Sequence, residues 1–403
     1  MPPISHLRPS DLQGIAQLAI DATLGVTGIV EDLHRNVAKG APPLGKSPEG
    51  RTRGLTGLVY RSIRGVTRLT GATLQAALRP LIPLFAEQPS SPQRLAVIAA
   101  MNGVMGDYLL ATANPLAIAM HLSAEGRTLV LDAPALAEAL PGACGKVVLL
   151  VHGLCMNDAG WKRNGHDHGE VLARELGATA IYLHYNTGLH ISTNGAQLAA
   201  LLEAVSAAWP VPIAELTIVG HSMGGLVARS AVRAAECAGH HWRARLKALV
   251  FLGTPHFGSP VERGGSRIDG VLAISPYIAP FAKLGRIRSA GITDLRHGNL
   301  TDADWQHADR FARGPRRPVA VPLPDGVACF AIAATTGARS GDRKDRLLGD
   351  GLVPVASALG RHRLPSASLA IPPERQRIVT HTDHMELLSS EAVCEQLVQW
   401  LRN

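Results

Sequence analysis

The sequence predicts an α/β protein built on a doubly wound, mostly parallel sheet with helices on both faces. Short apolar runs that read as strands begin at Val147, Ala180, Leu216, Ala248, Val327 and Leu369. Helical patterns stand between them and begin near Gly169, Asn194, Met223 and Glu391. Strands that alternate with helices need right-handed crossovers, which make the strands parallel and gather their carboxyl ends at one edge. Active-site loops are expected at that edge.

Composition is consistent with a large globular core, because 46% of the 403 residues are hydrophobic. We expect two parts, a helical N-terminal region over residues 1–112 and the α/β domain over residues 113–403. The second part should open with a hairpin, Ala117–Leu122 and Thr128–Leu131, around the turn residues Glu125-Gly126.

The N-terminal region carries apolar residues at helical spacing, of which Leu12, Ile15, Leu18 and Ala19 are examples. A second helix is expected over Leu55–Leu78, beyond a breaker-rich loop. Its apolar side holds Leu58, Val59, Ile63 and Val66, and another side holds Arg61, Arg64 and Arg68. A basic amphipathic helix suits a membrane or a polymer surface, and packing on its own protein is the alternative.

The most informative motif is Gly220-His221-Ser222-Met223-Gly224, which follows the apolar run Leu216–Val219 and precedes a helical pattern. A G-x-S-x-G turn between strand and helix is so sharp that it exposes the serine hydroxyl. Ser222 is therefore the predicted nucleophile, and a plain helix N-cap is the alternative.

A serine nucleophile needs a base and an acid that orients the base, and in this kind of fold both come later in the chain. Asp350 stands between two glycines after the strand that starts at Val327, and it is the predicted acid. His384 precedes an apolar helical start after the strand expected at Ser368–Ile371, and it is the predicted base. The competing candidates are His381 for the base and, for the acid, Asp342 and Asp345, which stand among arginines.

The oxyanion of an acyl-transfer step needs backbone N–H donors. The strand Val147–Val151 ends in His152-Gly153-Leu154, so the amides of Leu154 and Met223 are the predicted pair. Tyr185 and Asn186 end another strand at this edge, where they either touch substrate or hold their loop.

An insert at about residues 261–318 interrupts the alternation and includes the proline-containing apolar stretch Val271–Ala282. Its place after the nucleophile suits a lid over an acyl chain, and a structural helical excursion is the alternative.

Five segments in order resemble the α/β-hydrolase superfamily, in particular the bacterial triacylglycerol lipases and the GPI-inositol-deacylase-like esterases. They are Val151–Leu154, Gly220–Gly225, Leu252–Ser259, Asp350–Pro354 and His384–Leu387. The resemblance covers about residues 115–403, and it implies Ser222 as nucleophile, Asp350 as acid and His384 as base.

The residues and the resemblance together predict a serine carboxylic-ester hydrolase that acts on lipid-like or medium-chain acyl esters through an acyl-enzyme. A polyester depolymerase, a thioesterase and an acyltransferase are alternatives because they share this chemistry. From another class, a catalytically silent hydrolase-like binding module is the alternative, which a covalent serine probe would distinguish.

No cofactor or metal is expected. Asp383 and Glu386 flank the predicted base on one loop only, which is a weak case for calcium, and His166-Asp167-His168 is expected to open a helix. The five cysteines read as buried free thiols. The net charge of +8 is spread along the chain and aromatic residues make up 4%, so nucleic acid is not an expected partner. Without a recognised signal peptide or membrane span, a cytoplasmic location is expected.

Overall fold

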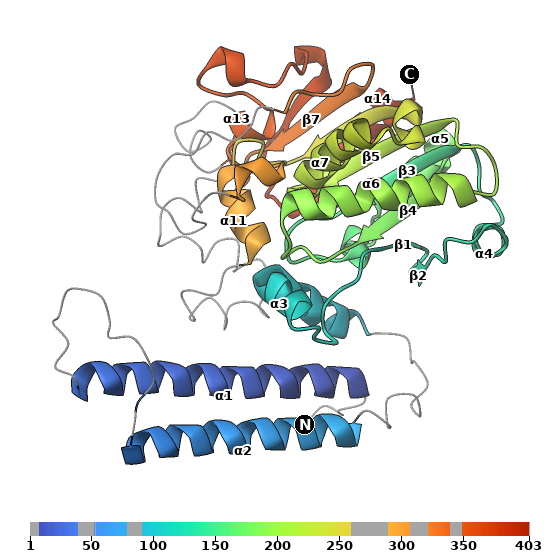
Figure 1. Ribbon diagram of the computed structural model, residues 1–403. Coiled ribbons are helices and arrows are strands. Elements are labelled where there is room, and N and C mark those ends of the chain that lie inside the picture. Colours follow the sequence, from blue (N-terminus) through green and yellow to red (C-terminus); the bar gives the residue numbers. More distant parts are fainter. Residues whose placement is uncertain are drawn as a thin grey trace. The chain divides into compact units, whose positions relative to one another are not determined.

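The computed structural model describes residues 8–38, 52, 54–78, 91–258, 289–306, 321–338 and 349–402 (Figure 1). The chain divides into two compact units, of which the first comprises Met1–Arg94 and Ala111–Ala117. The second comprises Leu95–Leu110 and Ile118–Asn403. The domain boundary at residue 112 remains a prediction, and the compact units differ from it by assigning Leu95–Leu110 to the second unit.

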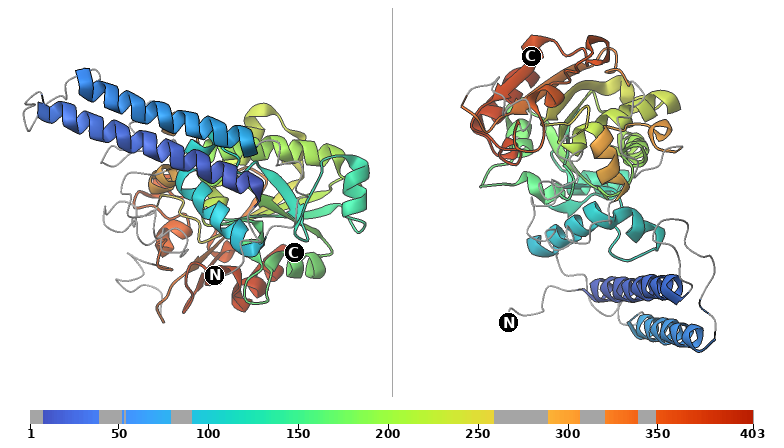
Figure 2. Two further views of the ribbon diagram at one scale, coloured as in Figure 1. Left: turned by 90° about the horizontal axis from the view of Figure 1, so that it is seen from below. Right: turned by 90° about the vertical axis from the view of Figure 1, so that its left-hand side faces the viewer.

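The first unit contains the two predicted helices, α1 (Pro9–Ala38) and α2 (Gly54–Leu78), which lie side by side (Figure 2). Glu31 of α1 joins them, because it accepts hydrogen bonds from the amide and hydroxyl of Thr52 and pairs with Arg64 of α2. The Thr52 hydroxyl, more than the Arg64 charge, lowers the pKa of Glu31 to about 2. Arg64, one of the three arginines on the predicted basic side of this helix, therefore belongs to the contact between the two helices.

Most of helix α3 (Pro92–Ala111) belongs to the second unit. Asn102 Oδ1 accepts from the amide of Ile118 (2.9 Å), and Ser289 Oγ donates to the carbonyl of Gly103 (2.6 Å). By length and composition alone α3 could cross a membrane, which differs from the expectation, and it is the one such helix in the described part of the chain. Buried core helices meet the same criterion, so this is weak evidence for a span.

The second unit is built on one sheet, with strand order β2-β1-β4-β3-β5-β6-β7-β8. The strands are β1 (His121–Ala124), β2 (Arg127–Thr128), β3 (Lys146–Val151), β4 (Thr179–His184), β5 (Glu215–His221), β6 (Leu246–Leu252), β7 (Ala328–Ala334) and β8 (Gln376–Val379). Strands β4, β3, β5, β6, β7 and β8 run parallel, and β1 is antiparallel to β2 and β4. The predicted mostly parallel sheet is confirmed.

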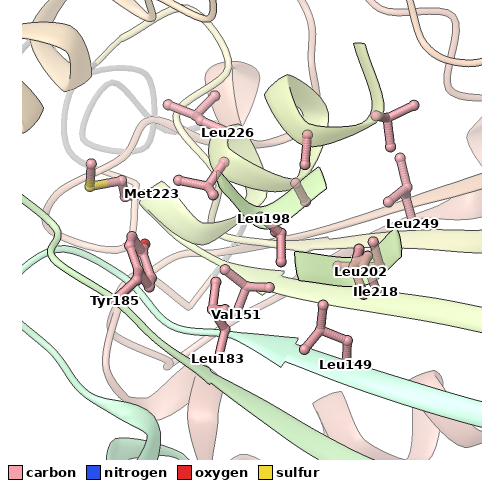
Figure 3. Close-up of a cluster of buried hydrophobic side chains, with 14 of the residues drawn as sticks. Leu149, Val151, Leu183, Tyr185, Leu198, Leu202, Ile218, Met223, Leu226 and Leu249 are labelled. Atoms are coloured by element: carbon pink, nitrogen blue, oxygen red, sulfur yellow. The ribbon is translucent and has the colours of Figure 1, made fainter. Parts of the chain in front are cut away.

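Alternate residues of the central strands enter two separate hydrophobic clusters, which shows that both faces of the sheet are covered. On one face, Leu149, Ile218 and Leu249 meet side chains of α6 (Ile191–Ala208) and α7 (Met223–Ala238) (Figure 3). On the other face, Val148, Leu150, Val219 and Val250 meet α5 (His168–Leu176) and α14 (Glu391–Leu401). The shorter helices are α4 (Ala133–Ala139), α11 (Ala290–His297) and α13 (Val355–Ala358).

Two predicted strand positions need correction. The hairpin turns at Glu125-Gly126 as predicted, with φ of 50° and 74°, but its strands are shorter than expected. The last strand is Gln376–Val379 and not Ser368–Ile371. Pro372 and Pro373 follow Ile371 and cannot donate to a ladder, so Ile371 packs in the core while the ladder with β7 starts later.

Of the predicted insert at residues 261–318, the structure describes α11, the short helix η4 (Asp302–Asp304) and the residues beside them. The stretch Val271–Ala282 lies outside the described residues, as do Asp342 and Asp345. The lid therefore remains a prediction.

Candidate active site

Ser222 sits on the turn that joins β5 to α7, in a backbone conformation with φ of 54° and ψ of −124°. A non-glycine residue with positive φ costs on the order of 1–3 kcal/mol and persists only where its surroundings hold it. Here the Ser222 amide donates to the carbonyl of Leu252 (2.8 Å). A Cβ at Gly224 would lie 2.2 Å from the carbonyl oxygen of Val151, so a larger residue cannot replace this glycine without moving β3.

Asp350 and His384 form a buried pair, with 2% and 4% of their surfaces exposed. His384 Nδ1 donates to Asp350 Oδ2 (2.7 Å), and the His384 amide donates to the carbonyl of Asp350 (3.0 Å). Asp350 Oδ1 accepts from the amides of Leu352 (3.0 Å) and Val353 (2.8 Å). The carboxylate is thus fixed by its own loop, and the bond at Nδ1 leaves the lone pair of the neutral ring on Nε2.

Ser222 and His384 face the same small cavity, of about 20 Å³, whose wall also includes Gly153, Leu154 and Met385. No hydrogen bond joins Ser222 Oγ to His384 among the residues that the structure describes. Catalytic hydrogen bonds are often loose before substrate binds, so this arrangement is compatible with a nucleophile and its base. The cavity has room for about one water molecule.

The predicted oxyanion donors lie on either side of the serine. Met223 follows it in the chain, and Leu154 lines the same cavity. In the described part of the molecule neither amide donates a hydrogen bond. A Cβ on Gly153 would lie 3.0 Å from Ser222 Cβ, so this turn approaches the serine closely. Two unpaired N–H groups beside a hydroxyl are the donors that an oxyanion requires.

His221 is a site residue that the sequence analysis did not single out. It is fully buried, and its Nε2 donates to the backbone carbonyl of His384 (2.9 Å), with the two ring centroids 4.7 Å apart. Burial, and then the neighbouring His384, hold the pKa of His221 well below its usual range. His221 is therefore a neutral donor that positions the segment carrying His384.

Gly253 lies against the buried pair at the end of β6, with φ of 58°. A Cβ there would lie 3.1 Å from Asp350 Oδ2, 3.2 Å from His384 Cε1 and 2.8 Å from Leu387 Cδ1. This close approach explains a glycine in the segment that the sequence resemblance already included.

The loop around His384 has its own internal support. Asp383 Oδ1 accepts from the amides of Met385 and Glu386, and Glu386 Oε2 accepts from the amide of Asp383. These carboxylates thus hold the turn. His381, the competing base, is exposed.

The neighbouring strand ends hold their own loops. The Tyr185 hydroxyl donates to the carbonyl of His152 (2.8 Å), and Asn186 bonds both Gly106 and Gly188. Both side chains are buried. Of the two readings for Tyr185 and Asn186, the structure thus supports the one in which they tie down the loop.

Part of the second unit matches a known family model. Residues 143–323 match the family model described as the PGAP1-like alpha/beta domain. No curated protein sequence matches the chain significantly. The mature lipase BlEst2 of Bacillus licheniformis is 18% identical with a TM-score of 0.39, over 64% of this chain and 92% of that one.

Two further solved structures are similar at the same low level. The Pyrococcus furiosus esterase Pf2001 is 14% identical with a TM-score of 0.37, over 65% of this chain and 84% of that one. The phospholipase PlaB of Legionella pneumophila is 15% identical with a TM-score of 0.35, over 53% and 45%. The sheet order, the Ser222 turn and the family match together establish an α/β-hydrolase fold for the second unit, which confirms the predicted fold class.

Proposed function

We propose that the protein is a serine hydrolase of carboxylic esters, with Ser222 as nucleophile, His384 as base and Asp350 as the acid that orients His384. The observation that carries this proposal is the buried 2.7 Å bond between Asp350 and His384, whose ring faces the same cavity as the strained Ser222. Ser222 and His384 line this cavity beside two unpaired amides, and Asp350 holds the ring of His384 from behind. The fold itself is one in which ester hydrolysis is common.

In the proposed reaction, Ser222 Oγ attacks the carbonyl carbon while His384 Nε2 takes the hydroxyl proton. The oxyanion is held by the amides of Leu154 and Met223, and its collapse expels the alcohol with the proton from His384. A water molecule, deprotonated by His384, then attacks the acyl-enzyme, and the acid leaves as Ser222 regains its proton. Asp350 keeps the ring in the required tautomer and stabilises the imidazolium throughout.

The substrate class that we propose is a lipid-like or medium-chain acyl ester. The cavity wall supports it, since most of its side chains are apolar: Leu154, Met156, Pro255, Leu295, Leu352, Val353 and Met385. Leu295 belongs to α11, so part of the predicted insert lines the same cavity as Ser222, as a lid would. Because about 20 Å³ is too small for an acyl chain, the proposal requires that the site open.

The experiment that tests this function is a series of nitrophenyl esters from acetate to palmitate, with an emulsified triacylglycerol beside them. The proposal expects activity that rises with chain length and is lost in Ser222→Ala. Activity confined to acetate and butyrate would reduce the assignment to a short-chain esterase. Equal activity of the Ser222→Ala protein would contradict the role of Ser222, and a wild type inactive on all esters and thioesters would favour the binding module.

We also propose that α2 contacts a lipid or polymer surface. Leu55, Leu58, Val66 and Leu69 are each more than half exposed, and Arg61 and Arg68 are exposed as well. Such a helix gains free energy from apolar burial and from attraction to anionic lipids. Co-sedimentation with anionic vesicles should fall when Val66 and Leu69 are both changed to Glu, and unchanged sedimentation would contradict the contact.

A further inference from the structure

Three metal-binding side chains meet on the face of the sheet covered by α5 and α14. One ring nitrogen each of His166 and His168 and the sulfur of Cys394 all lie within 4.8 Å of one another. His168 and Cys394 are buried, and His166 is partly exposed. The cysteine follows the histidines by more than two hundred residues, so the chain has to fold before this group forms.

The two histidines are joined by a hydrogen bond, which a bound metal would replace. His168 Nε2 donates to the carbonyl of Leu387 (2.9 Å), so His168 Nδ1 carries the lone pair and accepts a hydrogen bond from His166 Nε2 (2.8 Å). Metal-binding histidines commonly donate their other ring N–H to a backbone carbonyl in this way. The backbone of His166 is fixed by two hydrogen bonds with Arg163 (2.9 Å each).

We propose that His166, His168 and Cys394 form a structural zinc site. Two imidazoles and a thiolate match the ligand preference of Zn²⁺, whereas Ca²⁺ and Mg²⁺ require oxygen ligands. Tetrahedral coordination with Zn–N near 2.05 Å and Zn–S near 2.3 Å places the nitrogens about 3.3 Å apart and each about 3.6 Å from the sulfur. The histidine nitrogens, now 2.8 Å apart, need to separate by about 0.5 Å, and the sulfur, which lies within 4.8 Å of the ring nitrogens, needs to approach by up to about 1.2 Å.

A solvent-connected cavity of about 740 Å³ adjoins the group, and its wall includes His166 and Cys394 beside the charged residues Arg174, Glu175, Glu391, Glu395 and Arg402. Water from this cavity completes the tetrahedron. Binding releases the thiol proton of Cys394 to solvent, while His166 moves its ring proton to Nδ1 so that Nε2 can bind the metal.

This zinc site would brace the active site without taking part in the reaction. Through His168 it is linked to the carbonyl of Leu387, three residues after His384, and through Cys394 to α14. Metal binding would thus fix α5, α14 and the segment carrying His384 to one another. The inference stands independently of the proposed function because metal binding is measured without substrate.

The test uses the full chain without an affinity tag, dialysed against chelator and titrated with Co²⁺ as a spectroscopic substitute for Zn²⁺. One equivalent should bind and produce thiolate-to-cobalt charge-transfer absorption and the visible bands of a tetrahedral site. Zinc should then displace it in one equivalent. Cys394→Ser should abolish the charge-transfer band and weaken binding by more than the 10–100-fold typical of an outer-shell change.

Cys329→Ser is the matched control, because Cys329 is also a buried free thiol but lies on β7. It should bind Co²⁺ as the wild type does. Circular dichroism would show whether Cys394→Ser folds. If it does not, His166→Gln, at a partly exposed position, provides an independent test and should also lose Co²⁺ binding. A wild type that binds no equivalent of Co²⁺ or Zn²⁺ would overturn the proposal, as would wild-type affinity and spectrum in His166→Gln.

Discussion

Asp350→Asn should inactivate the protein with little change in its fold. Asp350 Oδ1 accepts two backbone N–H bonds, from Leu352 and Val353. An asparagine must keep its carbonyl oxygen there, which turns its NH₂ group toward His384 Nδ1. The ring must then accept at Nδ1 and carry its proton on Nε2, so it cannot take the proton of Ser222. The equivalent change in a known serine triad lowers kcat by about 10⁴-fold, or about 5 kcal/mol in the activation free energy.

The assay is hydrolysis of a nitrophenyl ester at neutral pH, with thermal unfolding to confirm the fold. The backbone bond from the His384 amide to the carbonyl of residue 350 survives the change, so the melting temperature should move by only a few degrees. Asp383→Asn is the matched control on the neighbouring loop, and it should keep most of the activity. A kcat for Asp350→Asn above about a tenth of the wild-type value would refute the orienting role.

Three further outcomes are expected. Gly253→Ala adds a Cβ 3.1 Å from Asp350 Oδ2 at a residue whose φ is 58°. The free energy of unfolding, measured with denaturant, should therefore fall by about 1–2 kcal/mol. An unchanged free energy of unfolding would contradict this close contact. His221→Ala removes the hydrogen bond to the carbonyl of His384, so kcat should fall by roughly 10–100-fold while KM stays nearly unchanged. A rise in KM as large as the fall in kcat would argue against a role of His221 in positioning His384.

In the N-terminal unit, the stabilisation by Glu31 is present above its ordinary pKa of 4.5 and is lost as pH falls toward about 2. Helix content followed by circular dichroism should therefore decline over this window less in Glu31→Gln than in the wild type. Parallel declines would argue against the Glu31 contact.

The residues of the proposed triad could be predicted from short motifs and from the order of the strands. The glycines around Ser222 mark a turn that larger side chains would block, and the Asp350 and His384 loops follow the last strands of a parallel sheet. Because parallel strands bring such loops to one edge, the meeting of Asp350 with His384 followed from topology. The structure shows that bond directly, while the reactivity of Ser222 remains a proposal.

The features that were missed depend on contacts between distant residues. Arg64 reads as part of the basic side of its helix until Glu31 of the other helix faces it. His221 reads as a variable position within its motif until the carbonyl of His384 meets its ring. Nothing in the sequence around Cys394 indicates that its sulfur lies near His166 and His168 in the folded chain. Cytoplasmic location and the absence of a nucleic-acid partner remain predictions.

We propose that Ser222 is a nucleophile whose hydroxyl is activated by the base His384. This can be measured by intact-protein mass spectrometry after treatment with a fluorophosphonate, because the probe reacts much faster with an activated serine than with an ordinary hydroxyl. We expect one adduct per chain on the wild type, mapped by peptide digestion to Ser222, and none on Ser222→Ala or His384→Ala. An unlabelled wild type, or an adduct that persists in Ser222→Ala, would contradict it.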